Sequence, residues 1–233
     1  MSHEHLPHNE EHFRATDLVR DIVIGMSDGL TVPFALAAGL SGAHVASRVV
    51  VLAGLAEIAA GSIAMGLGGY LAARTDTEHY RNELQREIRE TRELPAKERA
   101  EVEEVFEGFG LTPAQIHPIA DTIVADENRW VRFMMKFELG LEEPDPTRAV
   151  RSASAIALSY IVGGLVPLAP YFIASDLEKA LMASVIVTVL ALFVFGGVKA
   201  RFTGIPSWRG GTQTALIGGL AAAAAFAIAG LFR

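Results

Sequence analysis

Residues 23–40 have the sequence VIGMSDGLTVPFALAAGL, an apolar run that carries one carboxylate, Asp28. A run of this length can cross most of a bilayer as a helix. An ionised carboxylate is costly in hydrocarbon, so we expect Asp28 to bind a cation, carry a proton or face water. Pro33 cannot donate to the carbonyl of Gly29, which leaves that oxygen free beside the carboxylate. The stretch therefore predicts a membrane helix that holds a positive ion; the alternative is a neutral Asp28 hydrogen-bonded within a helix bundle.

Apolar residues fall in blocks along the whole chain. It has 233 residues, of which 51% are hydrophobic, and a mean hydropathy of +0.32. We predict an all-α membrane protein with five transmembrane helices, because each block has about the 20 residues that a bilayer requires. The predicted spans are residues 20–41, 46–73, 150–173, 178–199 and 212–232. A polar, His-rich tail over 1–19 precedes them without a signal-peptide pattern, and a polar helical insertion over 74–149 separates the second and third spans.

The short segments next to the spans differ in their Lys and Arg content, and these residues are enriched on the cytoplasmic side. One set of flanks holds Arg14, Arg20, Arg74, Arg81, Arg148, Arg151, Lys199, Arg201 and Arg209, and the other holds only Arg48 and Lys179. The N-terminus and residues 74–149 are therefore predicted to be cytoplasmic, with the C-terminus on the opposite side. The short, Ala-rich chain suggests a bacterial plasma membrane. The absence of cysteine excludes thiolate metal sites.

The second span combines metal-binding side chains with small residues on one helix face. A stripe about 80° wide at 100° per residue contains Gly54, Glu57, Gly61, Met65 and Gly68. Glycines at such spacing alone indicate close helix packing, but a Glu on the same face must point to protein or a cavity. Together with Asp28, Glu57 predicts a cation path through the membrane. The thioether of Met65 suits transition metals better than Mg²⁺ or Ca²⁺.

The polar insertion is predicted to be helical. Residues 74–93 continue the second span, Pro95 restarts a helix that runs to about Phe106, and Thr112-Pro113 begins a helix that runs to about Ala125. A last helix is predicted over 126–141, before Pro144 and Pro146 close the region.

Carboxylates recur at helical spacing in this insertion. Glu83, Glu87 and Glu90 share one helix face, and Glu98, Glu101 and Glu104 share another. Like charges at this spacing repel, so a bound cation would offset them; the alternative is a solvated face relieved by neighbouring Arg and Lys. Further along, Met134 and Met135 flank Glu138 in helical projection. Carboxylates with thioethers form a mixed ligand set suited to a borderline ion such as Fe²⁺.

These segments resemble the vacuolar iron transporter family, including its nodulin-21-like and bacterial members. The resemblance rests on residues 28–42, 56–66 and 134–141, and extends over nearly the whole chain from about Asp21. It implies a homodimer that exports Fe²⁺, or similar ions such as Mn²⁺, from the cytosol in exchange for protons. In the family pattern Asp28, Glu57 and Met65 match the transport path. The cytoplasmic metal ligands match Glu87, Glu90, Glu98, Glu101, Met134, Met135 and Glu138, whereas Glu83 and Glu104 are candidates from spacing alone.

Other classes of protein fit the sequence less well. A ferritin-like iron oxidase normally needs Glu-x-x-His on its helices, and this chain has no Glu followed three residues later by His. A metal-sensing or metal-storing membrane scaffold would not need Asp28 and Glu57 within its spans. No basic patch with aromatic partners or phosphate-binding glycine loop indicates nucleic acid or nucleotide binding. We therefore predict a secondary transporter rather than an enzyme, with metal as substrate and no prosthetic group.

Overall fold

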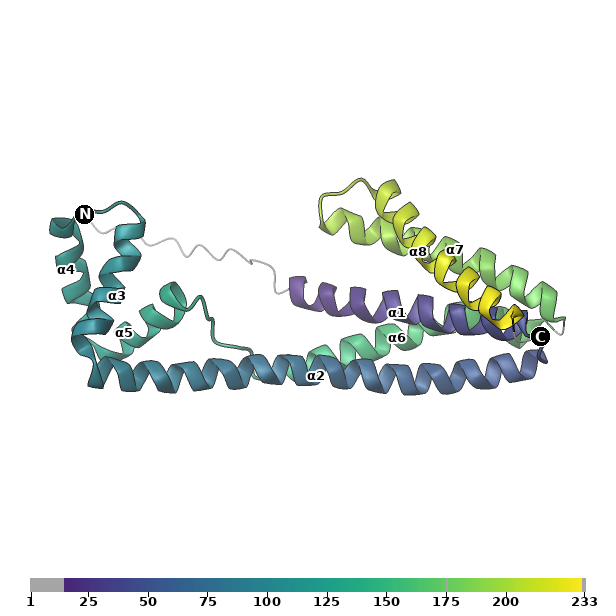
Figure 1. Cartoon of the computed structure of the whole chain (residues 1–233), viewed down its shortest axis with the longest axis horizontal. Helices are drawn as coiled ribbons and strands as arrows, with labels where there is room; N and C mark the ends of the chain where they lie inside the picture. Colours follow the sequence, from purple (N-terminus) through teal and green to yellow (C-terminus); the bar gives the residue numbers. More distant parts are fainter. Residues whose placement is uncertain (1–14, 175, 232–233) are drawn as a thin grey trace, which may run out of the picture. The chain divides into compact units, whose positions relative to one another are not determined.

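The computed structural model describes residues 15–174 and 176–231, and all regular secondary structure in this part of the chain is helical (Figure 1). The N-terminal histidines lie outside the described residues. The elements are α1 (Ala15–Gly42), α2 (Ser47–Glu93), α3 (Pro95–Gly108), α4 (Pro113–Val124), α5 (Glu127–Phe133), the π-helix η1 (Met134–Glu138), α6 (Arg148–Ile173), α7 (Leu177–Phe202) and α8 (Ser207–Gly230). The predicted all-α fold is confirmed.

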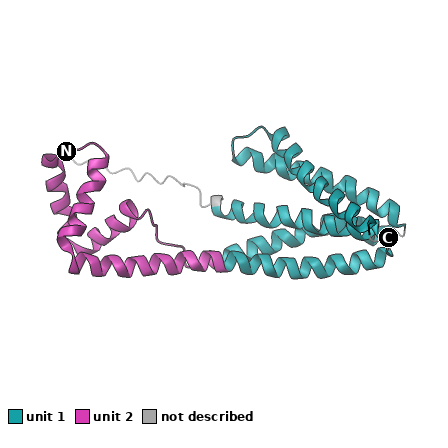
Figure 2. Ribbon diagram, viewed as in Figure 1, with its two compact units in different colours: residues 1–70, 150–233 teal, residues 71–149 magenta. Residues whose placement is uncertain are grey.

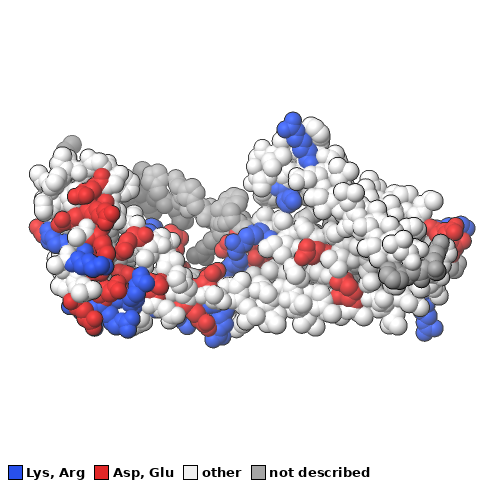
Figure 3. Space-filling view, in the orientation of Figure 1, with Lys and Arg blue, Asp and Glu red and all other residues white. Residues whose placement is uncertain are grey.

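The chain divides into two compact units, which we call the membrane unit (residues 1–70 and 150–233) and the polar unit (residues 71–149) (Figure 2). The long helix α2 contributes to both. On the face shown in Figure 3, charged side chains are dense over the polar unit and sparse over the membrane unit.

Five helices are long and apolar enough to cross a membrane: α1, α2, α6, α7 and α8. The prediction of five spans is thereby confirmed. Large apolar side chains on these helices point outward, including Ile63, Met182 and Leu220, which are 71%, 68% and 68% exposed. Such a surface suits contact with lipid.

Helix α6 packs closely against both α1 and α2 through glycines. A Cβ added at Gly25 or Gly29 of α1 would overlap the backbone carbonyl oxygens of Ile156 or Tyr160 on α6. On α2, Gly54 and Gly61 likewise contact side chains of α6, as the glycine stripe predicted. The stripe prediction is wrong for Gly68, because no described atom lies within 4 Å of the position of its absent Cβ.

In the polar unit, α3, α4, α5 and η1 enclose an apolar core formed by Val102, Ala120, Ile123, Trp130 and Met134. Pro95 begins α3 after the break at Leu94, and Thr112-Pro113 begins α4, both as predicted. The structure adds a capping box, in which the side chain of Gln115 accepts from the Thr112 backbone amide.

The single α-helix predicted over 126–141 is wrong in its second half. Helix α5 ends at Phe133 and a π-helix continues to Glu138, so that the amide of Leu139 donates to the carbonyl of Met134 over 3.1 Å, an i→i+5 bond. The projection that placed two thioethers on either side of Glu138 assumed 100° per residue, which does not apply to a π-helix.

Candidate functional site

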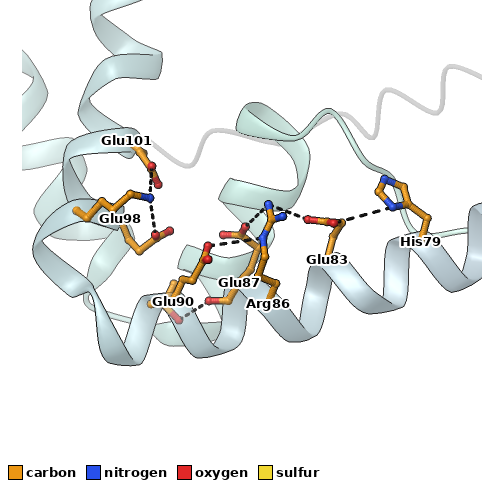
Figure 4. A network of polar contacts seen from close by, with 9 residues as sticks. His79, Glu83, Arg86, Glu87, Glu90, Glu98 and Glu101 are labelled. Atoms are coloured by element: carbon orange, nitrogen blue, oxygen red, sulfur yellow. Dashed lines mark hydrogen bonds and ion pairs between the residues drawn. The ribbon is translucent and has the colours of Figure 1, made fainter.

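Three predicted metal ligands of the polar unit meet at one point. Carboxylate oxygens of Glu87 and Glu90 on α2 and of Glu98 on α3 all lie within 4.8 Å of one another (Figure 4). The turn at Leu94 and Pro95 makes this possible, because it lets α3 start as a new helix directly after α2. Figure 4 shows Glu87, Glu90 and Glu98 gathered where the two helices join. We call these three residues the acidic cluster.

Two members of the acidic cluster are deeply buried. Glu98 is 0% and Glu87 is 1% exposed. Three of their carboxylate oxygens have no hydrogen-bond partner among the described residues: Oε1 and Oε2 of Glu98 and Oε2 of Glu87. A buried carboxylate without a partner carries a large desolvation cost in its charged form. The cluster is therefore suited to hold a cation, or protons when the cation is absent.

The electrostatics of the cluster favour the protonated form of its carboxyl groups. Burial, followed by the charges of Glu138 and Glu98, raises the pKa of Glu87 to about 7. Burial and the neighbouring Glu101 raise the pKa of Glu98, and the same two causes raise the pKa of Glu138. A divalent cation would reverse these shifts, since an opposite charge favours the ionised form.

Two basic side chains border the acidic cluster. Arg86 Nη2 lies 2.8 Å from Glu83 Oε2 and 3.9 Å from Glu87 Oε1, and Arg86 Nε lies 3.7 Å from Glu90 Oε2. On α3, Lys97 Nζ lies 2.7 Å from Glu101 Oε1 and 3.6 Å from Glu98 Oε1.

The other predicted metal ligands of the polar unit are not part of the acidic cluster. Glu101, Glu104 and Glu138 line an open pocket of about 550 Å³ together with Phe109 and Phe137. Both methionines are buried: Met134 packs within the apolar core, and Met135 is 2% exposed. The structure thus joins Glu138 electrostatically to the cluster, whereas the Met134 side chain contributes to the core.

The two predicted transport acids of the membrane unit, Asp28 on α1 and Glu57 on α2, are half-buried. Tyr160 of α6 donates its hydroxyl hydrogen to Oε1 of Glu57. The other carboxylate oxygen of Glu57, Oε2, has no hydrogen-bond partner in the described part of the chain. Met65, also half-buried, lies on α2 two turns after Glu57. A carboxylate of α2 is thus held by a hydroxyl of α6 inside the membrane unit.

Sequence analysis did not identify Tyr160, which is 2% exposed. A usable signal was present, because a buried tyrosine hydroxyl in an apolar span needs a hydrogen-bond partner. The carboxylates of the first two spans were the available acceptors.

The raised pKa of Glu87 gives a test on the metal-free protein. Because the folded state keeps a proton on Glu87 that the unfolded chain loses at a lower pH, stability should fall as the pH rises from about 5 to 7, by at most about 1.4 kcal/mol per pH unit for one proton. Glu87→Gln should therefore raise the thermal unfolding midpoint of the full chain in chelator at pH 8 and change it little at pH 5. Glu107→Gln, at an exposed position of α3, is the control. A variant less stable than the wild type at both pH values would contradict the expectation.

A helical bundle with five candidate spans, carboxylates inside it and a buried carboxylate cluster in its polar unit defines an integral membrane protein with a candidate cation site. A model of the VIT family matches residues 19–230, and the chain belongs to this family. It is 55% identical over 222 residues to Vacuolar iron transporter 1 of Tulipa gesneriana, covering 95% of this chain and 90% of the relative.

More distant members also align over most of this chain. Vacuolar iron transporter 1 of Arabidopsis thaliana is 51% identical over 222 residues, or 95% of this chain and 89% of the relative. Protein CCC1 of Saccharomyces cerevisiae is 38% identical over 226 residues, or 92% of this chain and 69% of the relative. The resemblance stated from the sequence is confirmed. The family consists of transporters, and the expectation that the chain is not an enzyme is therefore also confirmed.

Proposed function

We propose that this protein exports Fe²⁺, and related divalent transition metals such as Mn²⁺, from the cytosol in exchange for protons. The observation that carries the proposal is the half-buried Glu57 inside the membrane unit, which accepts a hydrogen bond from Tyr160 and whose Oε2 has no hydrogen-bond partner among the described residues. Intramembrane acids facing protein typically mark ion or proton pathways. The names of the relatives, which are iron transporters, supply the substrate.

The polar unit would collect the metal on the cytosolic side. Its proposed ligands are those of the acidic cluster together with the nearby acids and the two thioethers, namely Glu87, Glu90, Glu98, Glu101, Glu138, Met134 and Met135. The burial of Glu87 and Glu98 without hydrogen-bond partners supports this role. Met134, whose side chain packs in the apolar core, would need a change of side-chain conformation to reach the metal.

The membrane unit would carry the metal onward past Met65, Glu57 and Asp28. Metal arrival displaces protons from carboxylates, since a cation stabilises their ionised form. Protons entering from the far side would then return to the same oxygens and release the metal. Tyr160 would hold Glu57 in place through its hydroxyl while the second oxygen of Glu57, Oε2, stays available to a ligand.

The proposal includes a homodimer with the N-terminus and residues 74–149 in the cytosol and the C-terminus on the opposite side. The uneven distribution of Lys and Arg between the two sets of flanks supports this orientation. A bacterial plasma membrane is the proposed location, on the composition of the chain.

Metal flux into proteoliposomes tests the function directly. We expect the purified protein to move Fe²⁺ and Mn²⁺ faster than Mg²⁺, and an imposed pH gradient, acidic on the receiving side, to accelerate transport because protons move in the opposite direction. An encapsulated metal-sensitive dye and an external pH dye measure the two fluxes. Equal rates for Mg²⁺, or a rate indifferent to the pH gradient, would refute metal selectivity or proton exchange respectively.

A further inference from the structure

Arg86 lies among the acids of α2, and it interacts with carboxylates that a bound metal would also use. Its guanidinium faces three carboxylates on the same helix, with the shortest ion pair, 2.8 Å, to Glu83 and longer ones to Glu90 and Glu87 at 3.7 and 3.9 Å. Figure 4 shows Arg86 between Glu83 on one side and the acidic cluster on the other. An arginine is always charged and has five N–H donors in a planar group, so it can bridge several carboxylates at once.

The acidic cluster is not a closed network of ion pairs. Glu87 Oε2 and both oxygens of Glu98 have no hydrogen-bond partner among the described residues, although Glu87 and Glu98 are only 1% and 0% exposed. Arg86 therefore borders the cluster beside Glu87 and Glu90, and Lys97 borders it beside Glu98, with Lys97 Nζ 3.6 Å from Glu98 Oε1. The buried carboxylate oxygens between these two cations are left for a metal ion. A cation bound there would be repelled by a guanidinium that lies 3.9 Å and 3.7 Å from two of its ligands, Glu87 and Glu90.

We propose that Arg86, whose side chain is 44% exposed, is a built-in counter-ion that competes with the metal for Glu87 and Glu90, and that Glu83 is the residue to which Arg86 withdraws when metal binds. This inference rests on the cytoplasmic metal site of the proposed function. It assigns Glu83, a ligand candidate from its spacing, a different role: a carboxylate that positions Arg86. The 2.8 Å ion pair with Glu83 already exists, so withdrawal needs only the loss of the two longer contacts.

The arrangement would keep metal binding reversible. A site with several acids and no internal cation would hold a transition metal tightly and release it slowly. Because the arginine does not lose its charge at physiological pH, its competition would persist after the carboxylates have given up their protons. Arg86 would thus limit affinity at the entrance of a transport route, where release is as necessary as capture.

Anaerobic calorimetry of the full-length protein with Fe²⁺ tests the inference. We expect Arg86→Gln to bind Fe²⁺ about tenfold more tightly or better, since a charge at this distance is removed from a partly buried site. Arg86→Lys, which keeps the charge, should stay near the wild type. Arg89→Gln, at an exposed arginine on the same helix, is the matched control and should change nothing. Unchanged or weaker binding by Arg86→Gln would overturn the inference.

A double-mutant cycle separates the two possible roles of Glu83. If Glu83 acts through Arg86, Glu83→Gln should weaken Fe²⁺ binding in the wild-type background and have no effect in Arg86→Gln. If the loss persists in the double variant, Glu83 is a ligand and its role as the partner of Arg86 is wrong. Glu98→Gln is measured alongside: if it leaves wild-type binding unchanged, the cytoplasmic site of the proposed function fails and this inference fails with it. If it abolishes binding while Arg86→Gln has no effect, only the inference fails.

Discussion

Asp28→Asn and Glu57→Gln are each expected to reduce metal flux about 100-fold or more while leaving the protein folded. Both substitutions preserve the size of the side chain and most of its hydrogen-bonding capacity but remove its negative charge and its proton exchange. In Glu57→Gln, Tyr160 can still donate its hydroxyl hydrogen to the amide oxygen of the new side chain, so the α2–α6 contact should persist. Flux is measured in proteoliposomes at matched protein content.

The control for this prediction is metal binding at the polar unit, which contains neither residue. Calorimetry on both full-length variants should still detect binding that Glu98→Gln removes, and expression and thermal midpoints should stay near the wild type. Normal, proton-coupled transport by either variant would show that the substituted acid is a buried polar group outside the ion path.

The second large effect is expected at Gly25. A methyl group there would overlap the backbone carbonyl of Ile156, and a backbone atom cannot move aside as a flexible side chain can. Gly25→Ala should therefore force α1 and α6 apart. Overpacking of this kind costs about 3 kcal/mol, which corresponds to a fall of roughly 6 to 12 °C in the thermal midpoint for a chain of this size. The midpoint and the fraction of monodisperse protein after detergent extraction report the effect.

Gly219→Ala is the matched control for Gly25→Ala. It is the same substitution in a membrane helix, α8, but no described atom lies within 4 Å of the position where its Cβ would be. It should leave the midpoint unchanged or raise it slightly, because alanine is the better helix former. Equal destabilisation at both positions would indicate a general intolerance of α-helical glycine replacement rather than a close contact between α1 and α6.

The fold was largely predictable because its signals are local. Apolar blocks of bilayer length define the spans, and Pro95 and Thr112 mark helix starts through their own backbone chemistry. The π-helix at 134–138 was not predictable, because no single residue type specifies an i→i+5 bond. Its first residue, Met134, packs with Trp130 in the core of the polar unit, and such contacts between residues of different helices are not visible in sequence spacing.

The cytoplasmic candidate site was predictable from spacing only for the residues that lie on one face of a single helix. The spacing of Glu83, Glu87 and Glu90 on α2 indicated a shared face, but the closeness of Glu98 depends on the direction in which α3 leaves Leu94. The contact between Tyr160 and Glu57 joins residues 103 positions apart, and no periodicity within one span contains it. The 2.8 Å ion pair of Glu83 with Arg86 agrees with the alternative of acids relieved by neighbouring Arg and Lys, although spacing alone does not show which acid each basic side chain faces.

Within the polar unit, helix α2 continues without a break to Glu93, and this continuity sets the rotational phase of the acids that it carries. Adding or deleting one residue between Glu83 and Glu87 would turn Glu83 relative to Glu87 and Glu90 by about 100°. The number of residues between these acids is therefore constrained as strictly as their identity.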